Sequence, residues 1–185
     1  MRATFRTPVT TVYAADGKVL EVKFPPESLA NLDPLFASLF DVEKRKKAAS
    51  QQLGLLPKKA VDVGDKWDQT VEAELGGGQT LTFGLEYAYA GPVEDNGQKL
   101  HRVKVLHKTV SYSMDPTSPS PLKVSQSDLK VNGSEGEFLL DAERGVIVRE
   151  SSKVVIGGTM TFLAGTQELP GKLDLTLSSK LTLQP

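Results

Sequence analysis

The stretch LTFGLEYAY at residues 81–89 decides the fold, because apolar and polar side chains alternate along it without a break. This period of two is typical of a β-strand that buries one face and exposes the other. The stretch therefore predicts a long antiparallel strand whose aromatic side chains mark the buried face of a sheet. The apolar side of this strand carries Leu81, Phe83, Leu85, Tyr87 and Tyr89.

The sequence on both sides of this strand extends the same pattern. Residues 66–75 also alternate, and the glycine run at residues 76–78 predicts a tight hairpin between the two strands. Residues 99–114 alternate too, but their apolar parity changes partway along. A change of parity means one extra residue in the strand, which predicts a β-bulge near residues 106–108.

Further strands are expected towards both ends of the chain. A Ser/Thr/Pro loop at residues 115–121 separates the first strands from a second set, which turns at residues 141–145 and ends in leucine alternation over residues 172–183. Near the N-terminus, an Asp-Gly pair predicts a hairpin over residues 9–23. Most of the chain is therefore expected to be antiparallel sheet.

One helix is predicted between the first hairpin and the main sheet. Asp33 is a suitable N-cap, Pro34 suits the first helical position, and Gly54 follows the expected end. The apolar side of this helix includes Phe36 and Phe40, and we expect it to pack on the sheet.

The predicted fold is α+β. A helix of about twenty residues covers about 30 Å by 10 Å, which is less than the apolar face of such a sheet. The sheet is therefore expected to curve strongly into a half-barrel of about eight to ten strands. One or two helices should pack on its concave face. Residues 1–185 are expected to form a single domain.

Composition excludes several classes of function. The 185 residues hold 22 Lys and Arg against 23 Asp and Glu, so the basic excess of a nucleic-acid-binding protein is missing. The chain has no Cys and two His, which excludes thiolate chemistry and leaves few metal sites. No apolar run approaches the roughly 18 residues of a transmembrane segment. We therefore expect no metal, no cofactor, no nucleic acid and no membrane span.

The candidate catalytic patterns are weak. Residues 132–136 (NGSEG) resemble a serine-nucleophile motif but lack its spacing and its strand-to-helix context, so a turn is expected there. His101 and His107 are about 20 Å apart on a regular strand, and the bulge should put them on opposite faces. Glu86, a candidate for glycoside cleavage, alternates away from the aromatic face and should lie at the surface. The chain is therefore predicted not to be an enzyme.

The aromatic side chains are the remaining candidates for a site. They could simply form the core, or they could line a cavity for a hydrophobic or lipid-like ligand beneath the helix. The sequence leaves both interpretations open. The candidate ligand-binding residues are Trp67, Phe83, Tyr87, Tyr89, Phe36 and Phe40.

Residues 56–67, LPKKAVDVGDKW, resemble the L-P-x-K-x-V-x-x-G-D-x-W signature of an uncharacterised family of exported bacterial proteins, found in planctomycetes and related phyla. The resemblance extends over residues 8–160. It implies an exported, periplasmic or cell-envelope location, although the opening residues contain no signal sequence. The chain would then be the C-terminal part of a longer exported protein. At fold level, the expected half-barrel also resembles bacterial lipoprotein carriers.

These patterns lead to two hypotheses. The first is a non-catalytic exported or cell-envelope domain that binds a hydrophobic or lipid-like ligand in a half-barrel. The second is a structural or adaptor module that contacts a protein partner through a strand edge and has a fully packed interior. The two hypotheses differ in whether the aromatic residues line a cavity or pack against one another.

Overall fold

The computed structural model describes residues 10–13, 19–23, 42–43, 46, 54–57, 59–118 and 122–183. The chain divides into two compact units, Met1–Leu56 and Pro57–Pro185.

The first unit contains a two-stranded antiparallel sheet. Strand β1 (Thr10–Tyr13) pairs with β2 (Val19–Lys23), which confirms the hairpin predicted around the Asp-Gly turn. The predicted helix after Asp33 lies outside the described residues, apart from residues 42, 43 and 46. Phe36 and Phe40 lie outside them as well.

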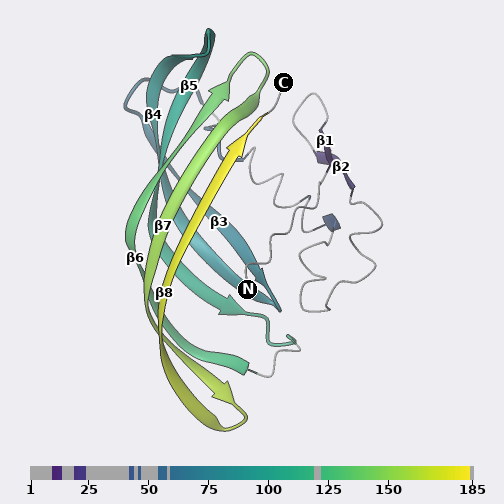
Figure 1. Ribbon diagram of the computed structural model, residues 1–185, viewed down its shortest axis with the longest axis vertical. Helices are drawn as coiled ribbons and strands as arrows, with labels where there is room; N and C mark the ends of the chain where they lie inside the picture. The colour runs from purple at the N-terminus through teal and green to yellow at the C-terminus, as the bar shows by residue number, and fades with distance from the viewer. Residues whose placement is uncertain are drawn as a thin grey trace. The chain divides into compact units, whose positions relative to one another are not determined.

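The second unit contains a six-stranded antiparallel sheet in which every strand pairs with its neighbours in the sequence. The strands twist and bend together along their length (Figure 1). Because the strand order follows the chain, β3 and β8 are the two edges of an open sheet. The strands are β3 (Lys66–Gly76), β4 (Gln79–Asp95), β5 (Gln98–Met114), β6 (Leu122–Asp141), β7 (Val146–Ala164) and β8 (Gln167–Thr182).

The predicted α+β half-barrel with helices on its concave face is wrong. The described residues are almost entirely antiparallel strand, and no helix among them packs on a face of the sheet. The prediction assigned part of the cover of the apolar face to a helix and the rest to curvature of the sheet. Strands of 16 to 20 residues, as in β4–β8, instead bend enough for side chains of non-adjacent strands to meet.

The bulge predicted near residues 106–108 is confirmed. The β4–β5 register shifts between Gly84 and Leu85, which pair with Thr109 and His107, so that Lys108 is the extra residue. The shift restores the apolar parity on both sides of the bulge, because Val110 again faces the same side as His107. An extra residue also bends its strand, which contributes to the curvature of the sheet.

Strands β5 and β6 pair over a short distance. Their ladder covers His101–Lys104 and Glu137–Leu140, whereas β6 and β7 pair from end to end. Residues 132–136 belong to β6 and carry a register shift between Val131 and Gly133. The turn predicted at residues 132–136 is therefore wrong, because pairing with β7 provides hydrogen bonds that outweigh the local turn preference of Asn, Gly and Ser.

Candidate functional site

The predicted aromatic residues of the main sheet lie on one face and contact one another. The rings of Trp67 and Tyr87 are stacked across the β3–β4 pair, with centroids 5.6 Å apart. Tyr87 also meets Phe138 of β6 edge to face at 6.2 Å. Tyr87 and Phe138 are each 2% exposed. Such pairs stabilise a core beyond the area they bury, so the three rings form the packed centre of this face.

Burial also determines the chemistry of the Tyr87 phenol. Its pKa is raised well above the usual value, first by desolvation and then by the negative charge of Glu150. The phenol therefore stays neutral over the whole physiological range. It can serve as a hydrogen-bond donor, but it does not supply a base.

Both histidines lie on the aromatic face, so the prediction that they lie on opposite faces is wrong. His101 stacks on Tyr89 with centroids 5.8 Å apart, and its Nδ1 atom is 2.6 Å from the Tyr89 hydroxyl. His107 meets the Phe83 ring edge to face at 5.2 Å. The parity changes at Lys108, which comes after His107, and the two histidines therefore keep the same parity.

His107 is held by Ser134 of β6. The backbone N–H of His107 donates to Ser134 Oγ at 2.8 Å, and His107 Nδ1 lies 3.0 Å from the same oxygen. Because Oγ accepts from the backbone, its own proton can be donated to Nδ1, which fits a neutral imidazole. Burial lowers the pKa of His107 below its usual value and favours the same neutral form.

Replacing His107 with glutamine is expected to reduce the loss of stability on acidification. The imidazole of His107 binds a proton less readily in the folded chain than in the unfolded chain, where its pKa is near 6.5. The contribution of neutral His107 to stability is therefore complete above the unfolded pKa, and it is lost as the pH falls through the lowered pKa of the folded chain. Denaturation by urea from about pH 8 to about pH 5 measures it. An unchanged pH dependence of stability in His107→Gln would contradict the assignment.

The opposite face of the sheet is charged. Glu86 lies between Lys66 at 3.0 Å and Lys108 at 3.6 Å. The hydrogen bond from Lys66 lowers the pKa of Glu86, and the charge of Lys108 adds to the effect against some desolvation. A glycosidase acid needs a raised pKa. Glu86 is therefore suited to cross-strand pairing rather than to proton donation.

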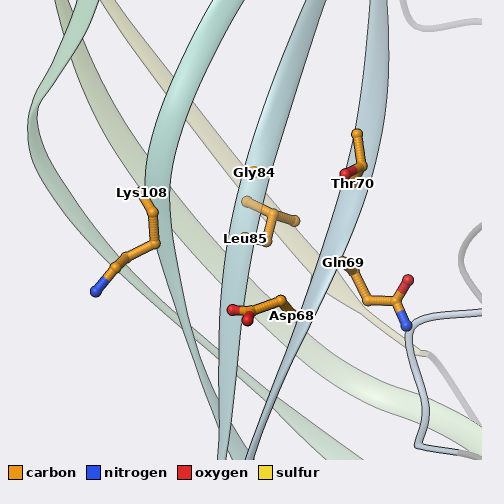
Figure 2. Close-up of a pocket in the computed structure, with 6 residues that line it drawn as sticks. All are labelled: Asp68, Gln69, Thr70, Gly84, Leu85 and Lys108. Carbon is orange, nitrogen blue, oxygen red and sulfur yellow. The ribbon is translucent and has the colours of Figure 1, made fainter.

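A depression of about 470 Å³ lies at the bulge beside this ion pair. Figure 2 shows Asp68 and Lys108 extending to one side of the strands, whereas Gln69 extends to the other. The depression follows from the extra residue in β5 and contains side chains of both signs. Its lining residues are Asp68, Gln69, Thr70, Gly84, Leu85 and Lys108.

A second depression, of about 440 Å³, spans β5 to β8 on the charged face. A row of register partners crosses the four strands here. Lys104 of β5 pairs with Glu137 of β6, Glu137 with Ser151 of β7, and Ser151 with Lys180 of β8. The lining holds three Lys and two Glu side chains, which leaves a net charge of only about +1. Opposite charges in neighbouring positions stabilise a sheet, so these side chains are suited to cross-strand pairing.

These features define an open antiparallel β-sheet protein with one packed aromatic face and one charged face. The chain matches no protein-family model, no curated protein and no solved structure. The resemblance of residues 56–67 to an exported bacterial family, and that of the fold to lipoprotein carriers, therefore stay predictions.

The described ranges contain no helix long and apolar enough to span a bilayer. Within the same ranges, no group of three or more His, Cys, Asp or Glu side chains is placed to hold a metal ion.

Sequence reasoning missed Phe138, His101 and His107 as members of the aromatic cluster. Alternation did place Phe138 on a strand, but it gave no indication of which aromatic ring lies opposite. That information depends on the β5–β6 pairing and on the bend of the sheet. The available signal was that His101 and His107 lie at alternate positions with the apolar Val103 and Val105, and so on the same side of the strand.

Proposed function

We propose that this chain is a non-catalytic interaction module of an exported or cell-envelope protein, and that the β8 edge accepts an extended segment of a partner polypeptide. The observation that carries the proposal is a long edge strand with exposed apolar side chains. β8 pairs with β7 along one side, from Ala164 and Gln167 to Arg149 and Thr182. Its other side is an edge of the sheet. Such an edge is a template for strand addition.

The side chains along this edge indicate the chemistry of the partner. Leu169, Leu181 and Leu183 are 40%, 41% and 42% exposed. These leucines share the aromatic side of the sheet, because Leu169 pairs in register with Phe162 on that side, and Leu181 and Leu183 have the same parity along a strand without register shifts. An added strand would therefore alternate, with apolar side chains continuing the aromatic side and polar ones continuing the charged side.

The packing of the aromatic cluster supports an interaction module over a ligand carrier. Trp67, Phe83 and Tyr87 contact other rings, and Phe83 and Tyr87 are buried. Side chains that fill the space around one another act as core. None of these three rings is among the residues that line the two described depressions.

A proline on β8 shows which of its residues can bond an added strand. Pro170 has no N–H and pairs in register with Thr161. A proline within a sheet is compatible with pairing only where its nitrogen faces the open edge. The β7–β8 register runs without a shift, so residues of the same parity, including Thr176, also direct their N–H groups outward.

The proposal is tested with a labelled peptide of residues 171–183 added to the full chain, read by fluorescence anisotropy. The parent chain is expected to bind it, and Thr176→Pro should weaken binding on the order of tenfold by removing one outward donor. The β7–β8 bonds do not use that donor, so thermal unfolding of the variant should stay close to that of the parent. Absence of peptide binding at any accessible concentration would reject strand addition.

A second candidate is binding of a hydrophobic or lipid-like ligand. It is favoured by the partial exposure of Trp67 and Tyr89 at the β3 side of the aromatic face. Trp67 is the one tryptophan of the chain, so its emission reports on this region alone. A saturable change in that emission on titration with a fatty acid would support a ligand, and a flat titration would leave the packed-core interpretation in place.

A further inference from the structure

We propose that the strand added to β8 is β8 of a second copy, paired antiparallel about a twofold axis through Leu177. This inference rests on the strand addition proposed above and names the partner. A twofold axis normal to the sheet keeps the aromatic sides of both copies on one side. The result is a continuous twelve-stranded sheet, twice the six strands of one chain.

Pro170 restricts the register of this pairing. Its nitrogen faces the open edge and offers no donor to a new strand, so a stable pair should leave it outside. Pairing centred on Leu177 runs from Gly171 to Leu183 on both copies and stops one residue short of Pro170. Registers centred nearer the start of β8 place Pro170 inside the pair.

Charge selects the same register. Centred on Leu177, the pair puts Asp174 of one copy opposite Lys180 of the other, and it does so twice by symmetry. Moving the centre by one residue to Thr176 puts Lys172 opposite Lys180 instead. Opposite charges across a strand pair are favourable and like charges are unfavourable. Among registers that leave Pro170 outside, only the one centred on Leu177 pairs opposite charges.

The leucines agree with this register. Leu181 of one copy lies opposite Leu173 of the other, and Leu177 lies opposite itself. Leu181 is 41% exposed in the single chain, so the pairing removes part of its apolar surface from water. The same contact joins the leucine rows of the two sheets into one apolar surface.

The other edge of the sheet has an acidic excess. The charged side of β3 carries Asp68, Glu72 and Glu74 against Lys66. Two copies of β3 paired about Thr70 would put Asp68 opposite Glu72, which is unfavourable. Pairing of β3 with β8 of another copy would be heterologous and would produce chains of molecules rather than closed dimers. That outcome is separable by experiment.

Cysteine cross-linking tests the twofold axis. The chain has no native cysteine, so Leu177→Cys introduces a single thiol. The N–H of residue 177 faces β7, so residue 177 of one copy and residue 177 of the other would form a non-hydrogen-bonded pair. The Cα atoms of such a pair are about 4.5 Å apart, and this separation suits a disulfide. Ser179→Cys is the matched control, since position 179 of the partner lies four residues, about 13 Å, along the strand.

Mild oxidation of the full chain should convert Leu177→Cys to covalent dimer at least tenfold faster than Ser179→Cys. Equal rates for the two variants would overturn the axis. Larger oligomers that Leu177→Cys fails to cross-link would indicate β3–β8 pairing and would also overturn it.

Charge reversal tests the register independently. Asp174→Lys and Lys180→Glu each place like charges opposite one another twice, and each should raise the dimer dissociation constant on the order of tenfold in sedimentation experiments. A mixture of the two single variants restores both opposite-charge pairs, and so does the double variant within one chain. Recovery of dimers in both cases supports the register, and this recovery cannot come from altered folding. Failure of both to recover overturns the register.

Failure of this inference is distinct from failure of the proposed function. A chain that stays monomeric at high concentration, yet binds the labelled peptide of residues 171–183 with the expected sensitivity to Thr176→Pro, retains strand addition and rejects a second copy as the partner. A chain that shows neither dimer nor peptide binding rejects both.

Discussion

Replacing Gly158 with alanine is expected to lower the free energy of unfolding by more than about 3 kcal/mol. Gly158 lies inside β7 with a φ of 156° and pairs with Leu129 of β6. A Cβ atom at this position would collide with the main chain of Asp128 and Leu129. Main-chain atoms of a central ladder cannot move aside without breaking hydrogen bonds, so relieving the collision costs a large amount of free energy. Urea denaturation of the full chain measures the loss.

The neighbouring glycine is a matched control. Gly157 lies on the same strand, and a Cβ atom there would meet chiefly the amide end of the Asn132 side chain. A flexible side chain can rotate away, and alanine also reduces the entropy of the unfolded chain. Gly157→Ala is therefore expected to change stability by less than about 1 kcal/mol. Equal losses in the two variants would show that the close approach of β6 and β7 at Gly158 is not as described.

Much of the second unit could be predicted because strand alternation and turn chemistry are local. The hairpin at residues 76–78 and the bulge at Lys108 each follow from side chains within a few positions of one another. Periodicity shows which side chains share a face, whatever the rest of the sheet does. The same reasoning correctly placed Trp67, Phe83, Tyr87 and Tyr89 together.

The errors arose where distant pairing outweighs local preference. Residues 132–136 have the composition of a turn, yet their main-chain groups pair with β7, and the strand continues. The helix predicted to cover the sheet followed from capping residues, which carry no information about what a sheet needs to bury its face. The short β5–β6 ladder was equally inaccessible, because it depends on how two bent strands diverge.

The open edges could not be derived either. Alternation is the same in an edge strand and in a central strand, so β8 and β7 look alike in sequence apart from Pro170. That proline was the one available sign that residues 167–182 lie at an edge. The proposed function therefore depends on topology, which composition and spacing do not encode.

Replacing Phe138 with alanine is expected to cost about 3–5 kcal/mol of unfolding free energy. Phe138 is 2% exposed, pairs in register with Val103 and meets the Tyr87 ring at 6.2 Å. The β5–β6 ladder is short, so few main-chain bonds hold these strands together where the ring lies. Removing the ring leaves a cavity at the point where β4, β5 and β6 converge, and the surrounding strands can close it only in part.

Phe162→Ala provides the comparison, because Phe162 is the same residue type on the same face but only half-buried near the end of β7. It should cost about 1–2 kcal/mol, since part of its surface already meets water. Near-ultraviolet circular dichroism of the folded Phe138→Ala chain should also change, because Tyr87 and its stacked neighbour Trp67 lose their packing. Similar losses for the two variants would contradict a core centred on Phe138 and Tyr87. They would also remove the main support for a packed aromatic face, and so reopen the choice between an interaction module and a ligand carrier.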